Sequence, residues 1–285
     1  MTDTKTCSVI QLNSDVHQSE NVLTDTSDII FKNKILTDTN SNQSKTIKHN
    51  SNDNINTLNL GLKRKGMNIG HLNLQGMNSK QKFSELSLML TSKNNNIHVL
   101  GISETKLNSD TFTDSLKING YKTPFRKDHL LRNNGGGLLI YLKENIDANR
   151  RCDLECFEIE CIILEIKCKK TKPFLICQMY RHPAEKVEWK NRFENFVENL
   201  YNQDREVIFI GDFNRDLLND QIKNDWLDFT ISLGLNQLIV MPTRVNNRSS
   251  TLIDHIYTNM PDNITSTCVP YIGISDHHAI FCNRN

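Results

Sequence analysis

The feature that most constrains the fold of this chain is an apolar run that ends in a carboxylate and an amide, at residues 207–214. Positions 207–210 are β-branched or aromatic, as a strand buried on both faces requires. Gly211 leaves room for close approach of a ligand or a second backbone, and Asp212 and Asn214 point to one face if the strand geometry continues. Such a pair suits the positioning of a water molecule on a substrate. An Asx turn, in which both side chains bond their own backbone, explains the pair equally well.

Composition divides the chain into two segments. Residues 1–66 are rich in Asn, Ser, Thr and Asp and contain one aromatic residue, Phe31. Such a segment buries too little apolar surface to offset its chain entropy, so we predict that residues 1–66 are disordered and that residues 67–285 form one folded domain. The chain carries 34 basic and 33 acidic residues and a net charge of +1, so charge alone predicts no nucleic-acid partner.

Cysteine usage and hydropathy indicate an intracellular protein. None of the eight cysteines belongs to a Cys-x-x-Cys pair, and several lie in apolar runs, which is typical of reduced, buried cysteine rather than of a zinc site or a disulfide framework. The N-terminus lacks the apolar core of a signal peptide. No stretch approaches the roughly 18 apolar residues of a membrane span, so we expect no membrane contact.

Hydrophobic periodicity predicts both strands and helices after residue 66. Apolar residues recur at helical spacing over 83–90 and 186–200, and a third helix is expected around Trp226. The Gly-rich stretch 133–137 precedes a strand and lacks the Gly-Lys-Ser/Thr ending of a phosphate-binding loop, so it predicts a hairpin turn. β-type apolar runs predict strands at 69–74, 97–102, 138–142, 158–168, 174–180, 207–211 and 250–257.

Polar side chains follow most of these strands. Loops after central strands are where α/β enzymes build their sites, and a carboxylate such as Glu104 suits a hard cation such as Mg²⁺. Each residue alone has an ordinary explanation, but their joint occurrence does not. The candidates are Asn73, Glu104, Tyr180, Asp212, Asn214, Asp254, Asp276 and His277. His255 and His278 alternate away from this set, so we expect them to be structural.

Six short motifs occur in a fixed order between residues 67 and 283. They are Asn73-x-x-Gly76, Ser-Glu-Thr-Lys at 103–106, Tyr180, Gly-Asp-Phe-Asn at 211–214, Leu-Ile-Asp at 252–254 and Ser-Asp-His at 275–277. Each motif is weak alone, but six of them in this order are highly specific. Together they resemble the endonuclease/exonuclease/phosphatase superfamily, which has the DNase I-like fold.

Four further motifs narrow the resemblance. They are Gly-Gly-Gly-Leu at 135–138, Asn-Arg-Asp-Leu-Leu at 214–218, Pro-Thr-Arg at 242–244 and Ser-Thr-Leu-Ile-Asp-His at 250–255. With them the chain looks most like the apurinic-type endonuclease domain of LINE-type non-LTR retrotransposons. Gln75 stands where apurinic repair enzymes carry an Asp metal ligand, which favours the retrotransposon branch and weakens metal binding at that position. The reverse transcriptase that normally follows is absent, so we expect a fragment, a truncated copy or a co-opted domain.

The resemblance implies an α/β fold and a hydrolytic activity. The fold would be a four-layer α/β/β/α sandwich of two mixed sheets flanked by helices, with the site at one rim. The activity would be that of a monomeric, Mg²⁺-dependent DNA endonuclease, with Mn²⁺ as an alternative ion, that leaves a 3′-hydroxyl and a 5′-phosphate. A nuclear location and DNA as the partner follow from the same resemblance.

The resemblance also assigns roles to the catalytic candidates. Asp212 would orient or deprotonate the attacking water, with Asn73 and Asn214 holding that water. His277 would contact the phosphate as an acid–base group or as a cationic clamp, and Asp254 would fix the tautomer of His277.

Metal and substrate contacts are assigned in the same way. Glu104 would hold Mg²⁺, and Asp276 would be a second carboxylate near the ion. Tyr180 and Thr243 would donate hydrogen bonds to phosphate oxygens. The cationic contacts to the phosphate backbone would be Arg181, Lys106 and Arg244.

Other activities use the same scaffold and stay open. They are apurinic/apyrimidinic repair endonucleases, and phosphatases or phospholipases that act on inositol phosphates or sphingomyelin. Fold alone does not choose between them. A catalytically dead DNA-binding relic is the non-enzymatic alternative, because transposon copies decay.

Overall fold

The computed structural model describes residues 59–77, 79–129, 135–169 and 171–285. The predicted disorder of residues 1–58 therefore lies outside the described residues. Residues 59–66 pack on the domain, ahead of its predicted start at residue 67. Leu60 is buried among apolar side chains, and the Asn68 side-chain amide donates a hydrogen bond to the carbonyl oxygen of Lys63.

The first sheet is built around a parallel pair of strands. β1 (Met67–Asn73) and β2 (Val99–Ser103) run parallel, in a register that places Asn73 beside Ser103. All other neighbours in this sheet are antiparallel. The strand order is β13 (Ile264–Cys268), β14 (Ile280–Arg284), β1, β2, β4 (Leu138–Leu142) and β3 (Phe125–Lys127).

The second sheet repeats this plan. β7 (Phe174–Tyr180) and β8 (Val207–Asp212) form its parallel pair, and the remaining neighbours are antiparallel. The strand order is β5 (Ala148–Arg150), β6 (Glu160–Ile166), β7, β8, β12 (Asp254–Thr258) and β9 (Asn236–Gln237). A separate two-stranded hairpin joins β10 (Arg244–Val245) to β11 (Ser250–Thr251).

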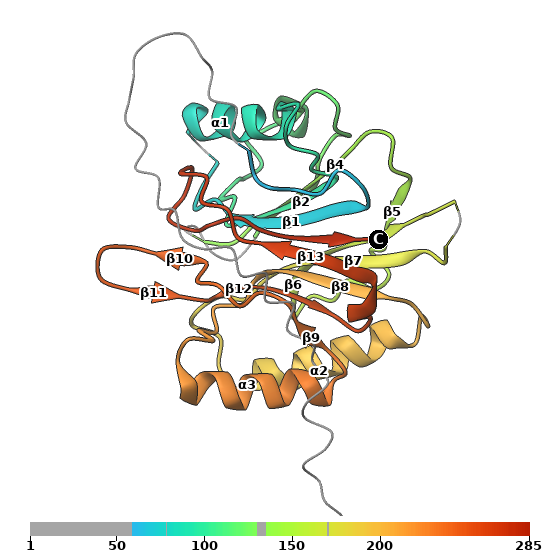
Figure 1. Ribbon diagram of the computed structural model, residues 1–285, viewed down its shortest axis with the longest axis vertical. Helices are drawn as coiled ribbons and strands as arrows, with labels where there is room; N and C mark the ends of the chain where they lie inside the picture. Colours follow the sequence, from blue (N-terminus) through green and yellow to red (C-terminus); the bar gives the residue numbers. More distant parts are fainter. Residues whose placement is uncertain (1–58, 78, 130–134, 170) are drawn as a thin grey trace, which may run out of the picture. The chain divides into compact units, whose positions relative to one another are not determined.

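Helices cover the outer faces of the two sheets, as the predicted four-layer α/β/β/α sandwich requires (Figure 1). α1 (Lys80–Thr91) packs on the first sheet, and α2 (Glu188–Tyr201) and α3 (Asp220–Ser232) pack on the second. Short 3₁₀ turns occur at Thr113–Leu116 and Pro261–Asn263.

Side-chain alternation along β8 explains why the strand lies between two apolar layers. Ile208 and Ile210 face the layer between the sheets, whereas Val207 and Phe209 face the helices. All four are fully buried, so the strand is apolar on both faces rather than alternating with polar residues. The predicted strand at 207–211 is confirmed, with one residue more at its end.

One predicted strand is interrupted. The expected strand at 250–257 is divided into β11 and β12, and Leu252 and Ile253 lie between them. The Ile253 carbonyl oxygen accepts a hydrogen bond from the Phe213 N–H, and the Leu252 carbonyl oxygen accepts one from the Leu217 N–H. These bonds to the chain after β8 replace a regular ladder, which hydrophobic pattern alone does not reveal.

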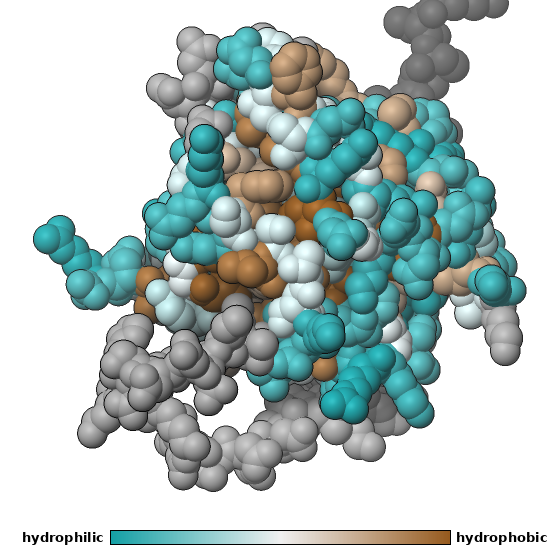
Figure 2. Space-filling view, turned by 90° about the horizontal axis from the view of Figure 1, so that it is seen from above, coloured by the Kyte–Doolittle hydropathy of each residue, from teal (hydrophilic) through white to brown (hydrophobic). Residues whose placement is uncertain are grey.

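The face seen from above in Figure 2 is mostly hydrophilic, with hydrophobic patches near its centre. Within the part of the chain that the structure describes, none of the helices has both the length and the apolar character needed to span a bilayer. The cysteines described, which exclude Cys7, are free thiols.

Candidate active site

The strand directions bring several polar residues to one rim. Because β1 and β2 are parallel, and β7 and β8 are parallel, the carboxyl ends of each pair meet at one edge of their sheet. β12 runs antiparallel to β8, so it begins at that edge, with Asp254 beside Asp212. Gly211 allows β8 to lie close to β7, since a Cβ atom there would lie 2.2 Å from the carbonyl oxygen of Met179.

Asn73 connects the two sheets at this rim. Its Nδ2 donates to Oε1 of Glu104 at 2.8 Å and to Oδ2 of Asp212 at 2.8 Å. Its Oδ1 accepts the backbone N–H of Gln75 at 3.0 Å, which fixes the orientation of the amide. One buried amide therefore holds two carboxylates, one from each sheet.

Glu104 is the carboxylate of this group that reaches solvent, with 17% of its side chain exposed. Oε1 accepts from Asn73 and, at 3.2 Å, from the Tyr180 hydroxyl. Oε2 lies 3.6 Å from Nζ of Lys106. Burial, followed by the charges of Glu104 and Asp212, raises the pKa of Tyr180 well above its usual range, so the hydroxyl keeps the proton that it donates.

Backbone strain gathers at the same rim. Five described residues other than glycine have positive φ, and four of them lie here, namely Gln75, Glu104, Lys106 and Asn214, with φ between 48° and 53°. This left-handed conformation costs an L-residue roughly 1–2 kcal/mol. Residues held in this way cluster at functional sites, where the surrounding structure fixes them.

Asp212 is almost fully buried and carries two hydrogen bonds. Oδ2 accepts from Asn73, and Oδ1 accepts the backbone N–H of Asn214 at 2.9 Å. This second bond is the Asx turn considered from the sequence, so the turn and the site coexist. Burial, followed by the charge of Asp254, raises the pKa of Asp212 to about 8. The Asn214 side chain donates to the carbonyl oxygen of Arg181 at 2.8 Å.

His277 and Asp254 form a buried dyad. Nδ1 of His277 lies 2.8 Å from Oδ2 of Asp254. Although burial disfavours a charged imidazole, the Asp254 carboxylate outweighs that effect and raises the pKa of His277 to about 9. Burial alone would raise the pKa of Asp254, but His277 and His71 on either side hold it well below its usual range. The dyad is therefore an imidazolium–carboxylate pair near neutral pH.

The sequence analysis missed His71 and Gln178. Nε2 of His71 lies 3.3 Å from Oδ1 of Asp254, and its Nδ1 lies 3.1 Å from Nε2 of Gln178. All three side chains are fully buried. His71 stands two residues before Asn73 on β1, and this same-face spacing was the signal that could have found it.

Thr243 and Arg181, both predicted to contact the phosphate, have buried side chains. Thr243 is fully buried, and its Oγ1 accepts the backbone N–H groups of Ile253 and Asp254 at 3.1 and 3.0 Å. Arg181 is 2% exposed, lies over the Trp189 ring, and has its pKa lowered to about 10 by burial. Their contact with a phosphate stays a prediction.

The remaining predicted contacts lie at the surface of the rim. Nε of Arg244 pairs with Oδ2 of Asp276 at 2.8 Å, and the two side chains are 41% and 33% exposed. An isolated antiparallel β-bridge between Arg244 and His277 joins the segment that contains Asp276 to β10. Lys106 is also exposed, beside Glu104. Asp276 thus has a cationic partner and lies outside the Asn73 network.

The two histidines expected to be structural both pack against aromatic side chains. His255 stacks on Phe213 at a centroid distance of 5.2 Å, and its Nδ1 lies 2.9 Å from the Tyr257 hydroxyl. His278 contacts the ring of Tyr271.

Glu104 offers the better fit to a divalent cation at this site. Asp212, Asp254 and His277 present ligand atoms within 4.8 Å of one another. The 2.8 Å contact commits Asp254 and His277 to each other through a shared proton. Glu104 is partly exposed, supplies carboxylate oxygens, and is held by Asn73 and Tyr180. Mg²⁺ prefers such oxygen donors and retains several waters, so the donor set fits this ion.

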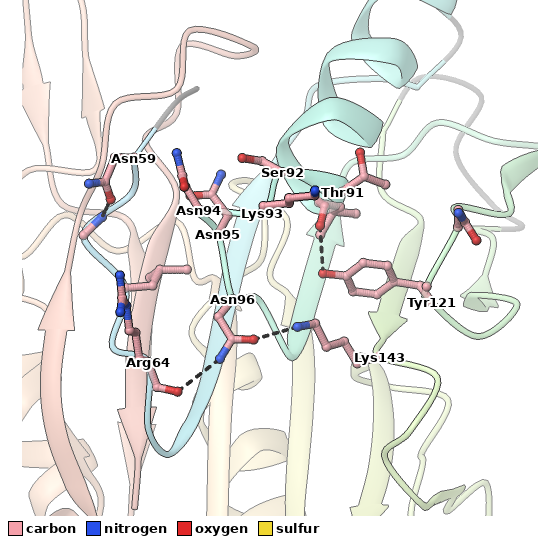
Figure 3. Close-up of a pocket in the computed structure, with 15 residues that line it drawn as sticks. Asn59, Arg64, Thr91, Ser92, Lys93, Asn94, Asn95, Asn96, Tyr121 and Lys143 are labelled. Atoms are coloured by element: carbon pink, nitrogen blue, oxygen red, sulfur yellow. Dashed lines mark hydrogen bonds between the residues drawn. The ribbon is translucent and has the colours of Figure 1, made fainter. Parts of the chain in front are cut away.

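A second hollow lies at the opposite ends of β1 and β2, near Asn96 and Lys143 (Figure 3). The Lys143 ammonium group donates to Oδ1 of Asn96 at 2.6 Å, and Asn96 donates in turn to the Arg64 carbonyl oxygen at 3.4 Å. The described residues that line it include no carboxylate. Among the described residues it therefore lacks the carboxylates that the rim brings together.

Several solved structures share this fold. The endonuclease domain of TRAS1, a telomere-specific non-LTR retrotransposon, matches with a TM-score of 0.59 and 17% identity, over 76% of this chain and 98% of that domain. An AP endonuclease from Leishmania major matches with a TM-score of 0.65 and 12% identity, over 77% and 88% of the two chains. A mannosyl-6-phosphatase from Bacteroides thetaiotaomicron matches with a TM-score of 0.56 and 16% identity, over 76% and 98%. At these identities the likeness concerns the fold alone.

The family of the chain is shown by a match to a family model and not by these structural likenesses. No curated protein matches the chain. The model of the Endonuclease/Exonuclease/phosphatase family matches residues 67–277, which include every strand except β14 and every residue of the carboxylate rim and the dyad. The chain therefore belongs to the endonuclease/exonuclease/phosphatase family.

Proposed function

We propose that this protein is a metal-dependent DNA endonuclease of the non-LTR retrotransposon type, which hydrolyses a phosphodiester to a 3′-hydroxyl and a 5′-phosphate. The observation that carries the proposal is the Asn73 amide, which holds Glu104 and Asp212 at 2.8 Å each, next to the His277–Asp254 dyad. In this proposal Glu104 binds the cation, Asp212 is the base and His277 is the cationic group that contacts the phosphate.

Asp212 is the group that takes a proton from the attacking water. At 1% exposure it is poorly solvated, and its raised pKa makes it a stronger base than an ordinary carboxylate. Asn73 orients the carboxylate from one side and the Asn214 N–H from the other. The water oxygen bonds to phosphorus and the P–O3′ bond breaks. O3′ leaves with the electron pair of that bond and takes a proton from solvent, and the proton on Asp212 returns to solvent.

His277 stabilises the charge of the phosphate. Asp254 keeps the imidazole protonated and fixes Nδ1 as a donor, so that Nε2 carries the second N–H group. A positive group aimed at phosphate oxygens lowers the barrier where charge develops. We propose Tyr180 as a positioning group, because its hydroxyl is bonded to Glu104.

Glu104 is the proposed metal ligand, with the hydroxyl of Tyr180 and the amide of Asn73 holding its Oε1. When bound, Mg²⁺ supplies charge neutralisation at the non-bridging oxygens and at the leaving oxygen. Lys106 and Arg244, both exposed at the rim, are the proposed contacts to the DNA backbone.

The test uses supercoiled plasmid with Mg²⁺, and compares the wild type with an Asp212→Ala/His277→Ala double variant. We expect the wild type to nick the plasmid and both the double variant and an EDTA-treated sample to leave it intact. Parallel reactions contain an abasic duplex and a phosphate monoester. Cleavage restricted to the abasic duplex or to the monoester, by folded protein, contradicts the proposal.

A further inference from the structure

We propose that His71 is a positioning residue for the dyad, in that its Nε2–H holds the Asp254 carboxylate on the side opposite His277. Asp254 lies between two imidazoles, with Oδ2 at 2.8 Å from His277 and Oδ1 at 3.3 Å from His71. Oδ1 of Asp254 and Nε2 of His71 are buried and have no hydrogen-bond partner among the described residues, so the 3.3 Å ion-pair contact is what joins them. Each is therefore the other's only compensation for burial.

Gln178 determines which nitrogen of His71 carries the proton. Nε2 of Gln178 is an amide nitrogen with hydrogen atoms to donate, and it lies 3.1 Å from Nδ1 of His71. Nδ1 must accept that hydrogen bond, so the proton of His71 is on Nε2, the atom that faces Asp254. An amide on β7 thus selects the tautomer of an imidazole on β1, which in turn holds a carboxylate on β12.

Gly101 on β2 makes room for this contact. A Cβ atom at Gly101 would lie 1.6 Å from Oε1 of Gln178, so only glycine leaves space for the Gln178 side chain. Gly101 pairs directly with His71 in the register of β1 and β2. The missing side chain at Gly101 on β2 therefore leaves the space through which Gln178 reaches His71 on β1.

The surroundings of His71 and Gln178 indicate that the two side chains do more than fill space between the sheets. The layer between the sheets is otherwise largely aliphatic, with residues such as Ile69, Ile210 and Ile256. Buried polar groups in such a layer cost free energy unless they are hydrogen-bonded. The series of contacts from Gln178 to His71 ends at Asp254, which belongs to the proposed catalytic dyad. The buried polar groups therefore lie where they can orient a reacting group.

The experiment compares two substitutions at position 71 in the full chain. His71→Leu matches the aliphatic layer but has no donor, whereas His71→Gln places an N–H donor where Nε2 was. We expect His71→Leu to lower kcat for plasmid nicking by about 10- to 100-fold with little change in KM, as removal of an outer-shell partner does elsewhere. His71→Gln restores most of the loss. His98→Ala, at the far end of the same sheet, is the matched control.

A second variant covers the case in which His71→Leu does not fold. Gln178→Met keeps the volume but removes the amide that selects the tautomer, and we expect it to lower kcat in the same direction. Wild-type kcat in both His71→Leu and Gln178→Met overturns the proposal. Equal losses in His71→Leu and His71→Gln also overturn it, because the donor would then not matter.

The kinetic test rests on the proposed nuclease function, so a second measurement is independent of it. Proton NMR observes the downfield N–H resonance of the His277–Asp254 hydrogen bond, assigned by its loss in His277→Gln. We expect this resonance to shift in His71→Leu and to return in His71→Gln. An unmoved resonance in folded His71→Leu overturns the positioning role. A shifted resonance in a protein that nicks no DNA overturns the proposed function and leaves the positioning role intact.

Discussion

Nδ2 of Asn73 lies 2.8 Å from Oδ2 of Asp212, although 139 positions separate the two residues along the chain. The bond joins the end of β1 in one sheet to the end of β8 in the other. Both side chains are buried, so the bond is shielded from water and supports the geometry of the rim.

Removal of the shared donor tests the importance of this bond. Asn73→Ala leaves Glu104 and Asp212 without their common partner, so both carboxylates reorient and the site loses its alignment. We expect kcat for DNA cleavage to fall at least about 100-fold, with a smaller change in KM. Asn119→Ala, at an exposed position, is the control. Wild-type kcat in Asn73→Ala would show that the shared amide is not needed.

Asp212→Asn separates activity from stability. Burial raises the pKa of Asp212 to about 8 from an ordinary value of 3.8, so the folded state holds this proton more tightly than the unfolded state. Its contribution to stability is therefore complete below about pH 4 and is lost as the pH rises towards 8. We expect the Asn variant to be inactive and to gain Tm relative to the wild type from pH 5 to pH 8, by about 2–4 °C per kcal/mol gained.

Differential scanning fluorimetry in EDTA measures this difference without interference from bound metal. Asp225→Asn, at an exposed carboxylate, provides the comparison. A Tm difference between Asp212→Asn and wild type that stays constant from pH 5 to pH 8 contradicts the raised pKa.

The pH dependence of cleavage follows from two groups. Asp212 must be ionised to act as a base, and its pKa is about 8, whereas His277 must stay protonated, and its pKa is about 9. We therefore expect kcat/KM to rise as the pH approaches 8 and to fall above about 9. Measured on the same substrate, His277→Gln should have low activity and no falling limb at high pH. An unchanged falling limb in this variant excludes His277 as its source.

Glu104→Gln tests the proposed metal ligand. The substitution keeps the size of the side chain but removes the charge that attracts Mg²⁺. We expect the Mg²⁺ concentration for half-maximal activity to rise at least tenfold, and maximal activity to fall. Titration of Mg²⁺ against nicking rate measures both. Glu144→Gln, at an exposed turn, is the matched control, and an identical titration curve for Glu104→Gln rejects Glu104 as a ligand.

The sequence predicted the architecture because the pattern of each central strand is local. The apolar run at 207–210 is buried on both faces, and this is visible from the residues alone. The positions of Asp212 and Glu104 also followed from the chain, since a residue after a parallel strand lies at the sheet edge.

The sequence could not show contacts that depend on how the two sheets pack. The role of His71 depends on Gln178 and Asp254, which lie on strands of the opposite sheet. Arg181 follows a site strand but turns inward onto Trp189, because α2 presents an aromatic ring there. The break between β11 and β12 depends on bonds from the chain after β8. Such pairings become visible only in three dimensions.

The most direct measurement is cleavage of an end-labelled DNA duplex by wild type and Asp212→Asn, with Mg²⁺ in excess, followed by identification of the new ends. We expect a wild-type product with a 3′-hydroxyl that a polymerase extends and a 5′-phosphate that a ligase accepts, and a rate at least about 100-fold lower for Asp212→Asn. Equal rates for the two proteins, or intact duplex after incubation with folded wild type, would contradict it.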